Sequence, residues 1–124
     1  MKRIVLIMFV LGLSFSAQIA QAQWTPVKRL TWNRGESAYP AIVVDSIDNL
    51  HVVWNDDDPG NYEIYYKRST DGGATWLAGK RLTWNRNPSL VPAIAVDPAD
   101  NLHVVWEEYL SGNAEIYYRK STDG

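Results

Sequence analysis

The sequence contains no cysteine, so disulfide bonds and a cysteine-linked lipid anchor are both excluded. Stability must therefore come from a packed core. The chain also has no excess of basic residues, since 12 Lys and Arg stand against 14 Asp and Glu. The basic patch of a nucleic-acid-binding protein is therefore not expected, and we predict no nucleic-acid partner.

Motifs that would indicate a catalytic or cofactor site are absent as well. No Ser-His-Asp, Cys-His or zinc-ligand spacing stands out in the sequence. The stretch Asp71-Gly72-Gly73 lacks the Lys and the following helix that a phosphate-binding loop needs. We predict no cofactor, no metal ion and no catalytic residue within this chain.

The first 22 residues predict a secretory signal peptide. Lys2 and Arg3 precede an apolar run over residues 4–15, and the segment ends in Ala20-Gln21-Ala22. A membrane anchor is the alternative, but it needs about 20 apolar residues. We therefore expect residues 23–124 to be secreted or extracytoplasmic, in the periplasm or at the cell surface, with no membrane span after cleavage.

The dominant feature of the sequence is an internal repeat. Residues 28–72 match residues 80–124 without a gap, and 30 of the 45 pairs are identical. Lys28-Arg29-Leu30-Thr31-Trp32, for example, recurs as Lys80-Arg81-Leu82-Thr83-Trp84. A period of about 50 residues is the size of one four-stranded β-propeller blade.

Each copy of the repeat predicts β-strands, and no helical periodicity follows the leader. The strands are expected to form antiparallel sheets, which makes the fold class all-β. In the first copy, residues 40–84, strands are predicted at 40–45, 49–55, 62–69 and 80–84. In the second copy, residues 92–124, they are predicted at 92–97, 101–107 and 114–121. A further outer strand is predicted at 27–33 because this segment repeats the fourth strand.

A short motif follows the third predicted strand of each copy. Ser69-Thr70-Asp71-Gly72-Gly73-Ala74-Thr75-Trp76 reads S-x-D-x-G-x-T-W, in which Asp and Gly predict a tight turn. The motif resembles the Asp-box of the sialidase-like, or BNR-repeat, β-propellers. The resemblance implies a structural role, in the hairpin between the third and fourth strands of a blade. The residues concerned are Ser69, Asp71, Gly73, Thr75 and Trp76, with Ser121 and Asp123 in the second copy.

The resemblance also implies that about two blades are present and that the ring is incomplete. Residues 40–84 make the first blade, and residues 92–124 make a second that stops inside its Asp-box. Residues 27–33 are the outer strand that closes such a ring, which typically takes about 4–8 blades. We therefore expect this chain to be the N-terminal part of a longer protein.

The two copies differ at 15 of the 45 paired positions, and nine of these lie in two loops, 35–39 and 55–59 with their counterparts. In an up-and-down blade both loops emerge at one end, opposite the Asp-box. A copied framework with one individualised end predicts a ligand face there, although surface loops can also vary freely. The candidate residues are Arg34, Tyr39, Asp56, Asp57, Arg86, Glu107 and Tyr109.

Other residues allow a functional and a structural interpretation. Asp56, Asp57 and Asp58, with Asn55 and Asn61 nearby, offer oxygen ligands for Ca²⁺, but a solvated turn fits their spacing better. His51 and His103 are one position repeated, which favours structural histidines. Arg34 and Arg86 would suit a carboxylate ligand or a local bond in each copy. The periodic aromatic residues indicate core between blades: Trp32, Trp54, Trp84 and Trp106, with Tyr65, Tyr66, Tyr117 and Tyr118.

Three functions stay open at this point. The first is a binding module for a glycan or a protein. The second is an exo-acting glycoside hydrolase of the sialidase type, and the third is a purely structural array. Catalytic sialidases carry an Arg-Ile-Pro near the first blade, whereas this chain has Tyr39-Pro40-Ala41-Ile42 there. No catalytic residue is therefore carried over, and the acid and nucleophile of an enzyme would lie in downstream blades.

Overall fold

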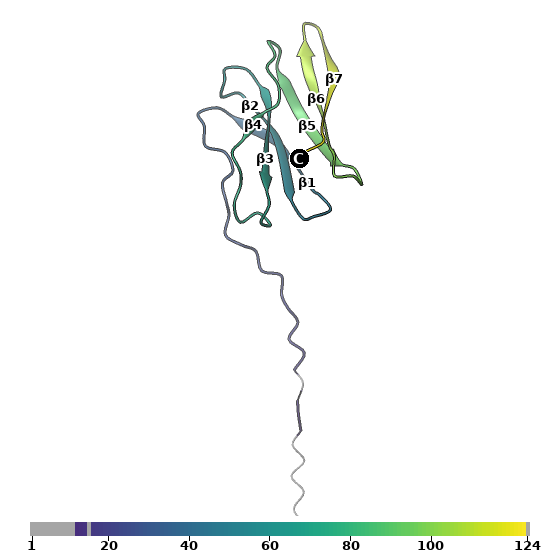
Figure 1. Ribbon diagram of the computed structural model, residues 1–124. Coiled ribbons are helices and arrows are strands. Elements are labelled where there is room, and N and C mark those ends of the chain that lie inside the picture. The colour runs from purple at the N-terminus through teal and green to yellow at the C-terminus, as the bar shows by residue number, and fades with distance from the viewer. Residues whose placement is uncertain (1–11, 15, 124) are drawn as a thin grey trace, which may run out of the picture.

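The computed structural model describes residues 12–14 and 16–123. Residues 1–11 and 15 lie outside the described residues. They include most of the apolar run of the predicted signal peptide. The described residues before Ser37 contain no strand or helix, and Figure 1 shows the early part of this segment running away from the sheets. The described residues include no helix of the length and apolarity that a membrane crossing requires.

Seven strands form two antiparallel sheets, which confirms the predicted all-β class (Figure 1). Sheet 1 has the order β1-β2-β3-β4, and sheet 2 has the order β5-β6-β7. Each sheet is thus an up-and-down meander in which sequence neighbours pair. The strands are β1 Ser37–Val44, β2 Leu50–Asp56, β3 Glu63–Ser69, β4 Lys80–Arg81, β5 Ser89–Val96, β6 Leu102–Leu110 and β7 Asn113–Ser121.

Strand β4 is shorter than its predicted span of 80–84. The N–H of Leu82 still donates to the Ile64 carbonyl at 2.7 Å. The N–H of Ile64, however, donates to the hydroxyl of Thr83 at 2.9 Å. A side chain thus replaces the backbone acceptor, and the regular strand pairing ends at Arg81.

Residues 27–33, predicted as an outer strand, form no strand. A strand needs a hydrogen-bonded neighbour, and no strand of the described residues pairs with this segment. It nevertheless lies on sheet 1 as the equivalent segment of the second repeat lies on sheet 2. Lys67 Nζ donates to the Leu30 carbonyl, and at the equivalent place in the second repeat the Arg119 guanidinium donates to the Leu82 carbonyl.

The two sheets pack through non-equivalent faces, with β1 and β2 against β5. Val53 and Tyr66 of sheet 1 are buried, whereas their equivalents Val105 and Tyr118 in sheet 2 are exposed. Tyr118 was expected in the core, and that prediction is wrong because nothing in the described chain covers its face of sheet 2. Tyr117, also expected in the core, is exposed as well, although it lies on the opposite face and stacks on Trp106. Such an interface is heterologous. The shared core consists of Val53, Ile64, Tyr66, Leu102, Val104 and Trp106.

The periodic tryptophans fall into two groups. Trp54 and Trp106 are buried, as predicted. The prediction is wrong for Trp32 and Trp84, which are exposed. Both belong to outer segments, where they contact cations: Lys67 Nζ lies 5.3 Å from the centre of the Trp32 ring, and the Arg81 guanidinium carbon lies 5.7 Å from that of Trp84.

The Asp-box forms the tight turn that its sequence predicts. The Asp71 carboxylate accepts hydrogen bonds from the N–H and the hydroxyl of Thr75, and these bonds lower its pKa to about 2. Ser69 Oγ accepts the N–H of Gly73 at 2.9 Å. Gly72 and Gly73 have φ values of 67° and 88°, which only glycine adopts easily.

The start of the second Asp-box has the same geometry. The Ser121 hydroxyl donates to Asp123 Oδ1 at 2.7 Å, as Ser69 donates to Asp71 at 2.8 Å. Trp76 is partly buried at the end of the first box.

Candidate functional site

Strand register places the four variable segments at one end of the two sheets. Ser37 pairs with Asp56 in sheet 1, and Ser89 pairs with Glu108 in sheet 2. We call this the loop end, formed by residues 33–39, 55–62, 85–91 and 107–113. The Asp-box and the β1–β2 and β5–β6 turns lie at the opposite, turn end, because Leu50 pairs with both Val44 and Ser69.

Asp56, a candidate ligand-face residue, is buried and holds the fold together. Its Oδ2 accepts hydrogen bonds from Asn33 Nδ2 and Ser37 Oγ, each at 2.6 Å, and from Trp54 Nε1 at 3.1 Å. Burial alone would raise the pKa of Asp56, but these bonds and one from the Asp58 N–H outweigh it and lower the pKa. The carboxylate is therefore engaged inside the repeat and is not presented to a ligand.

The other two aspartates of the triplet bind the neighbouring loop. Asp57 Oδ1 accepts the N–H of Glu36 at 2.6 Å, and Asp58 Oδ1 accepts the N–H of Arg34 at 3.2 Å. A Cβ at Gly35 would lie 2.4 Å from the Asp58 nitrogen, so this close approach requires glycine. The triplet thus acts as a turn. Within the described ranges, no group of three or more His, Asp or Glu side chains is arranged to hold a metal ion.

The second repeat reproduces the buried carboxylate and leaves its candidates exposed. Glu108 is buried and accepts Asn85 Nδ2 at 2.8 Å, as Asp56 accepts Asn33. Glu107, Arg86 and Tyr109 are exposed. Tyr109 is fixed through its backbone, because its N–H donates to the Pro88 carbonyl at 2.9 Å.

Asparagines join the loops of the two repeats, a role that the sequence did not predict. Asn61 Nδ2 donates to the carbonyls of Asn85 and Asn87 at 3.1 and 3.0 Å. Asn55 Oδ1 accepts the N–H of Val91 at 3.1 Å. Asn55 is fully buried, and its Nδ2 has no partner within the described residues. In the sequence, Asn55 could have been noticed because the second copy has Glu107 at the equivalent position.

Two tyrosines present their rings at the loop end. Tyr39 is 60% exposed and Tyr109 is 58% exposed, one in each repeat. Tyr39 lies in an irregularity of the β1–β2 pairing and has a φ of 52°, and Val91 has a φ of 49° at the equivalent place. The backbone therefore fixes the direction in which the Tyr39 ring projects. Arg34, Arg86 and Glu107 are exposed at the same end.

One further tyrosine at the loop end is tied down. The Tyr62 hydroxyl donates to Glu36 Oε2 at 3.0 Å, and this bond to a carboxylate raises the pKa of Tyr62. The Tyr62 carbonyl accepts the N–H of Ser89 at 2.8 Å. Tyr62 therefore connects the first loop, the second loop and sheet 2.

The histidines lie at the turn end, away from the candidate residues. His51 Nδ1 lies 2.8 Å from the Tyr66 hydroxyl, and His51 Nε2 lies 2.9 Å from Asp45 Oδ2. The second repeat has the same arrangement, which comprises Asp97, His103 and Tyr118. Each histidine is bonded within its own repeat, so the two do not converge on a shared site.

No protein-family model, curated protein or solved structure matches the chain. The likeness to sialidase-like propellers therefore rests on the residues of the Asp-box and the repeat alone.

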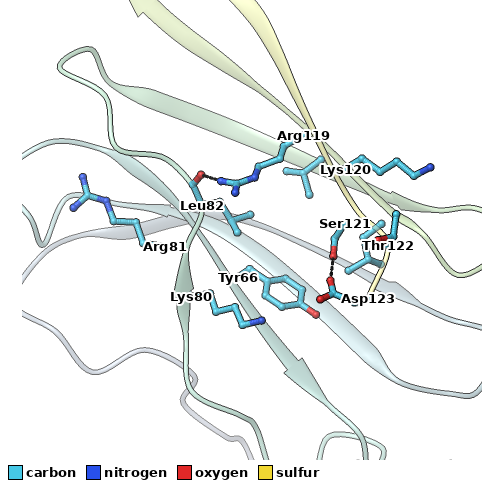
Figure 2. Close-up of a pocket in the computed structure, with 11 residues that line it drawn as sticks. Tyr66, Lys80, Arg81, Leu82, Arg119, Lys120, Ser121, Thr122 and Asp123 are labelled. Carbon is cyan, nitrogen blue, oxygen red and sulfur yellow. Dashed lines mark hydrogen bonds between the residues drawn. The ribbon is translucent and has the colours of Figure 1, made fainter.

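A cavity of about 370 Å³ lies between β4 and β7, away from the loop end (Figure 2). In Figure 2 the Tyr66 ring and Lys80 face Ser121 and Asp123 across it. Its lining includes Leu102 and Lys120. In the first repeat the equivalent place, beside Leu50 and Arg68, is occupied by the Asp-box segment 73–77. In the first repeat, the space equivalent to this cavity is therefore filled by the protein itself. We assign no ligand to the cavity.

Proposed function

We propose that this chain supplies two blades of a secreted, sialidase-like β-propeller that binds a glycan or protein ligand at its loop end. The proposal rests on a difference between the turn end and the loop end of the two sheets. At the turn end, the copied residues bond to one another within each repeat. At the loop end, the copies differ, and Arg34, Tyr39, Arg86, Glu107 and Tyr109 are exposed.

The packing of the sheets supports a propeller. Sheet 1 is a four-stranded antiparallel meander, the form of one propeller blade. Because the interface is heterologous, the face of sheet 1 that sheet 2 buries has an exposed equivalent on sheet 2. An interface of this type repeats until a ring closes, and about 4–8 blades of four strands do so in propellers.

The exposed side chains suit a polar ligand with flat apolar faces. Tyrosine rings offer apolar area and a polar hydroxyl, and arginine donates two parallel hydrogen bonds to a carboxylate. Both Tyr39 and Tyr109 lie at the same end as exposed cationic and anionic residues. Sugars, and acidic sugars above all, offer both kinds of contact.

Glycoside hydrolysis is less well supported. Such enzymes use two carboxyl groups on either side of the scissile bond. At the loop end, Asp56 and Glu108 are buried and hydrogen-bonded, so neither faces a substrate. A hydrolase would need its acid and its nucleophile from residues other than these two.

The test is a binding scan on the full-length protein. Immobilised sialylated and neutral glycans and a panel of extracellular proteins are screened first. Tyr39→Ala, Tyr109→Ala and Arg86→Ala should each weaken the binding found, whereas Ala99→Ser, an exposed change at the turn end, should not. Loss with Ala99→Ser alone would mean that the faces are exchanged. Release of the fluorophore from a fluorogenic sialoside would favour the hydrolase instead.

A further inference from the structure

The cationic residues gather on the outer strands of the two repeats. Lys2 and Arg3 lie in the leader, so ten of the 12 Lys and Arg lie in residues 23–124. Strands β1, β2, β5 and β6 contain none of these ten. Eight occur as adjacent pairs on the third strands, β3 and β7, and on residues 27–33 and 79–85, which we call the outer segments: Lys28-Arg29, Lys67-Arg68, Lys80-Arg81 and Arg119-Lys120. The positive charge of the chain therefore lies along its outer strands.

Three cations at the first outer segment keep their charge available. Lys28, Arg29 and Lys67 each donate a hydrogen bond to a backbone carbonyl. Within residues 12–14 and 16–123, none of the three forms an ion pair with a carboxylate. A carbonyl dipole does not neutralise a full charge, so an anion that approaches this segment meets uncompensated positive charge.

Each outer segment also exposes a tryptophan. Trp32 is 68% exposed and Trp84 is 64% exposed. Their surroundings differ. Trp32 lies beside the four-stranded sheet 1 and has no sheet before it in the described chain, whereas Trp84 follows sheet 1, and its segment lies beside the three-stranded sheet 2. Because the exposed fractions are nevertheless nearly equal, the exposure is a property of the repeat and does not depend on how many neighbouring sheets are present.

A cation contacts each of these tryptophan rings. Lys67 Nζ lies 5.3 Å from the centre of the Trp32 ring, and the Arg81 guanidinium carbon lies 5.7 Å from that of Trp84. An exposed indole presents a flat apolar surface on which the C–H face of a sugar ring can stack. A cation beside it can bind a carboxylate carried by the same ligand. The pairing of ring and cation therefore fits a sugar that carries negative charge.

We propose that the outer segments form a second binding surface, whose ligand is an acidic polysaccharide. Each exposed tryptophan stacks on one sugar ring of the polymer, and the cations around it bind carboxylates along the same chain. Residues 28–33 are identical to residues 80–85, so the same site recurs in each repeat. A polymer can engage several such sites at once, which raises its affinity without any new kind of contact.

This surface differs from the loop-end site in the residues that form it. The loop-end proposal rests on residues that vary between the copies, such as Tyr39 and Tyr109, whereas the outer segments are copied. Copied sites suit a ligand that repeats, and individual sites suit a ligand that does not. A nucleic acid also repeats, but residues 23–124 carry more acidic than basic residues, which disfavours the dense phosphates of that polymer.

A matched pair of polymers tests the class of ligand. The full-length protein is titrated with polygalacturonate and with its methyl ester, which has the same sugar chain without the charge. Polygalacturonate should bind at least about tenfold more tightly, and its affinity should fall as the salt concentration rises from about 0.1 M to about 1 M. Equal binding of the two polymers, binding of neither, or tighter binding of single-stranded DNA would overturn the proposal.

The tryptophans are tested by substitution. Trp32→Ala and Trp84→Ala should each weaken the binding of polygalacturonate by about tenfold, and the double variant should weaken it further. Ile47→Ala is the control, because Ile47 is exposed at the turn end and the second repeat has Ala99 at the equivalent position. Circular dichroism checks that each variant folds. Unchanged binding in the double variant would contradict a role for the outer segments.

A lysine substitution separates charge from structure. Lys67→Gln should weaken the binding of polygalacturonate, and Lys67→Arg should retain it, because Arg119 stands at the equivalent position in the second repeat. Equal binding by the two variants would show that the charge of residue 67 is not used. Tyr39→Ala should leave the binding of this polymer unchanged. If Tyr39→Ala abolished it while the tryptophan variants did not, the polymer would bind at the loop end, and the second surface would be refuted while the proposed function stood.

Discussion

The Asp–His–Tyr arrangements of the two repeats have the same bonds and different surroundings. The distance from histidine Nδ1 to the tyrosine hydroxyl is 2.8 Å in the first repeat and 2.9 Å in the second. The side chains of His51 and Asp45 are 1% and 6% exposed, whereas those of His103 and Asp97 are 30% and 29% exposed. Local bonding is therefore a property of the repeat sequence, and burial is a property of the neighbouring sheet. Matched substitutions in the two repeats separate these contributions.

The largest difference is expected for the central isoleucines. Ile64→Ala empties a fully buried site and should lower the free energy of unfolding by about 2–5 kcal/mol. Ile116→Ala, at an exposed position, should change it by less than about 0.5 kcal/mol. Urea unfolding of the two variants measures both. Equal losses would show that the face of sheet 2 on which Ile116 lies is covered in solution.

The histidines should show the same asymmetry at a smaller scale. His51→Ala removes the partner of the buried Tyr66 hydroxyl and one of the hydrogen bonds to the Asp45 carboxylate. A buried group left without its partner costs about 1–3 kcal/mol. His103→Ala removes a bond that water can replace and should cost less than about 1 kcal/mol. The readout is thermal unfolding monitored by circular dichroism. If His103→Ala were the more damaging change, burial would not be what sets the value of the bond.

Acid should act through the aspartates of these arrangements. Burial alone would raise the pKa of Asp45, but hydrogen bonds from His51 and Asn49 outweigh it and lower the pKa below the usual 3.8. The folded state therefore gains stability from ionised Asp45 above pH 3.8, and loses it as the pH falls through the lowered pKa. Unfolding free energies at about pH 7 and about pH 3 should differ less in Asp45→Asn than in the wild type.

The control for this pH experiment is the second copy. Hydrogen bonds from His103 and Asn101 lower the pKa of Asp97 as well. Asp97 is more exposed, so solvent screens its contribution, and Asp97→Asn should change the pH dependence less than Asp45→Asn. A larger change with Asp97→Asn would contradict the link between burial and pH sensitivity.

The smallest contrast is expected between the Asp-boxes. Asp71→Ala removes the acceptor for Thr75 and should lower the melting temperature modestly. Asp123→Ala removes an acceptor for Ser121 and should lower it less. Neither change should affect binding at the loop end. Lost binding by Asp71→Ala with an unchanged melting curve would contradict the structural role of the box.

The internal repeat made most of the fold predictable. Alternating and β-rich runs predicted each of the observed strands, and identical turns followed from identical residues such as Asp45 and Asp97. Burial was less predictable, because it depends on neighbours outside the repeat. Tyr66 is therefore buried and its equivalent Tyr118 exposed, although the residue type is the same in both copies. The outer segment 27–33 shows the same limit, since its predicted strand needs a partner that its own sequence does not supply.

At the loop end, variation between copies indicated the region but not the state of each side chain. Asp56 differs from its counterpart Glu108, yet both are buried and accept an asparagine amide. A sequence comparison scores that pair as a difference, although the bond is retained. Asn61 is identical in both copies, so comparing the copies does not reveal that it joins the two repeats. Its role depends on a backbone carbonyl, which leaves no trace in the residue type.

The positive φ of Val91 has a consequence for how the repeat can evolve. A β-branched residue in that region costs on the order of 1–3 kcal/mol. Tyr39 holds the same backbone conformation at the equivalent position, so the fold imposes it whichever side chain is present. Every copy of the repeat therefore carries the same backbone strain at this position. Replacing the residue by glycine would relieve the strain once in each copy, and each copy would lose the side chain that it presents there.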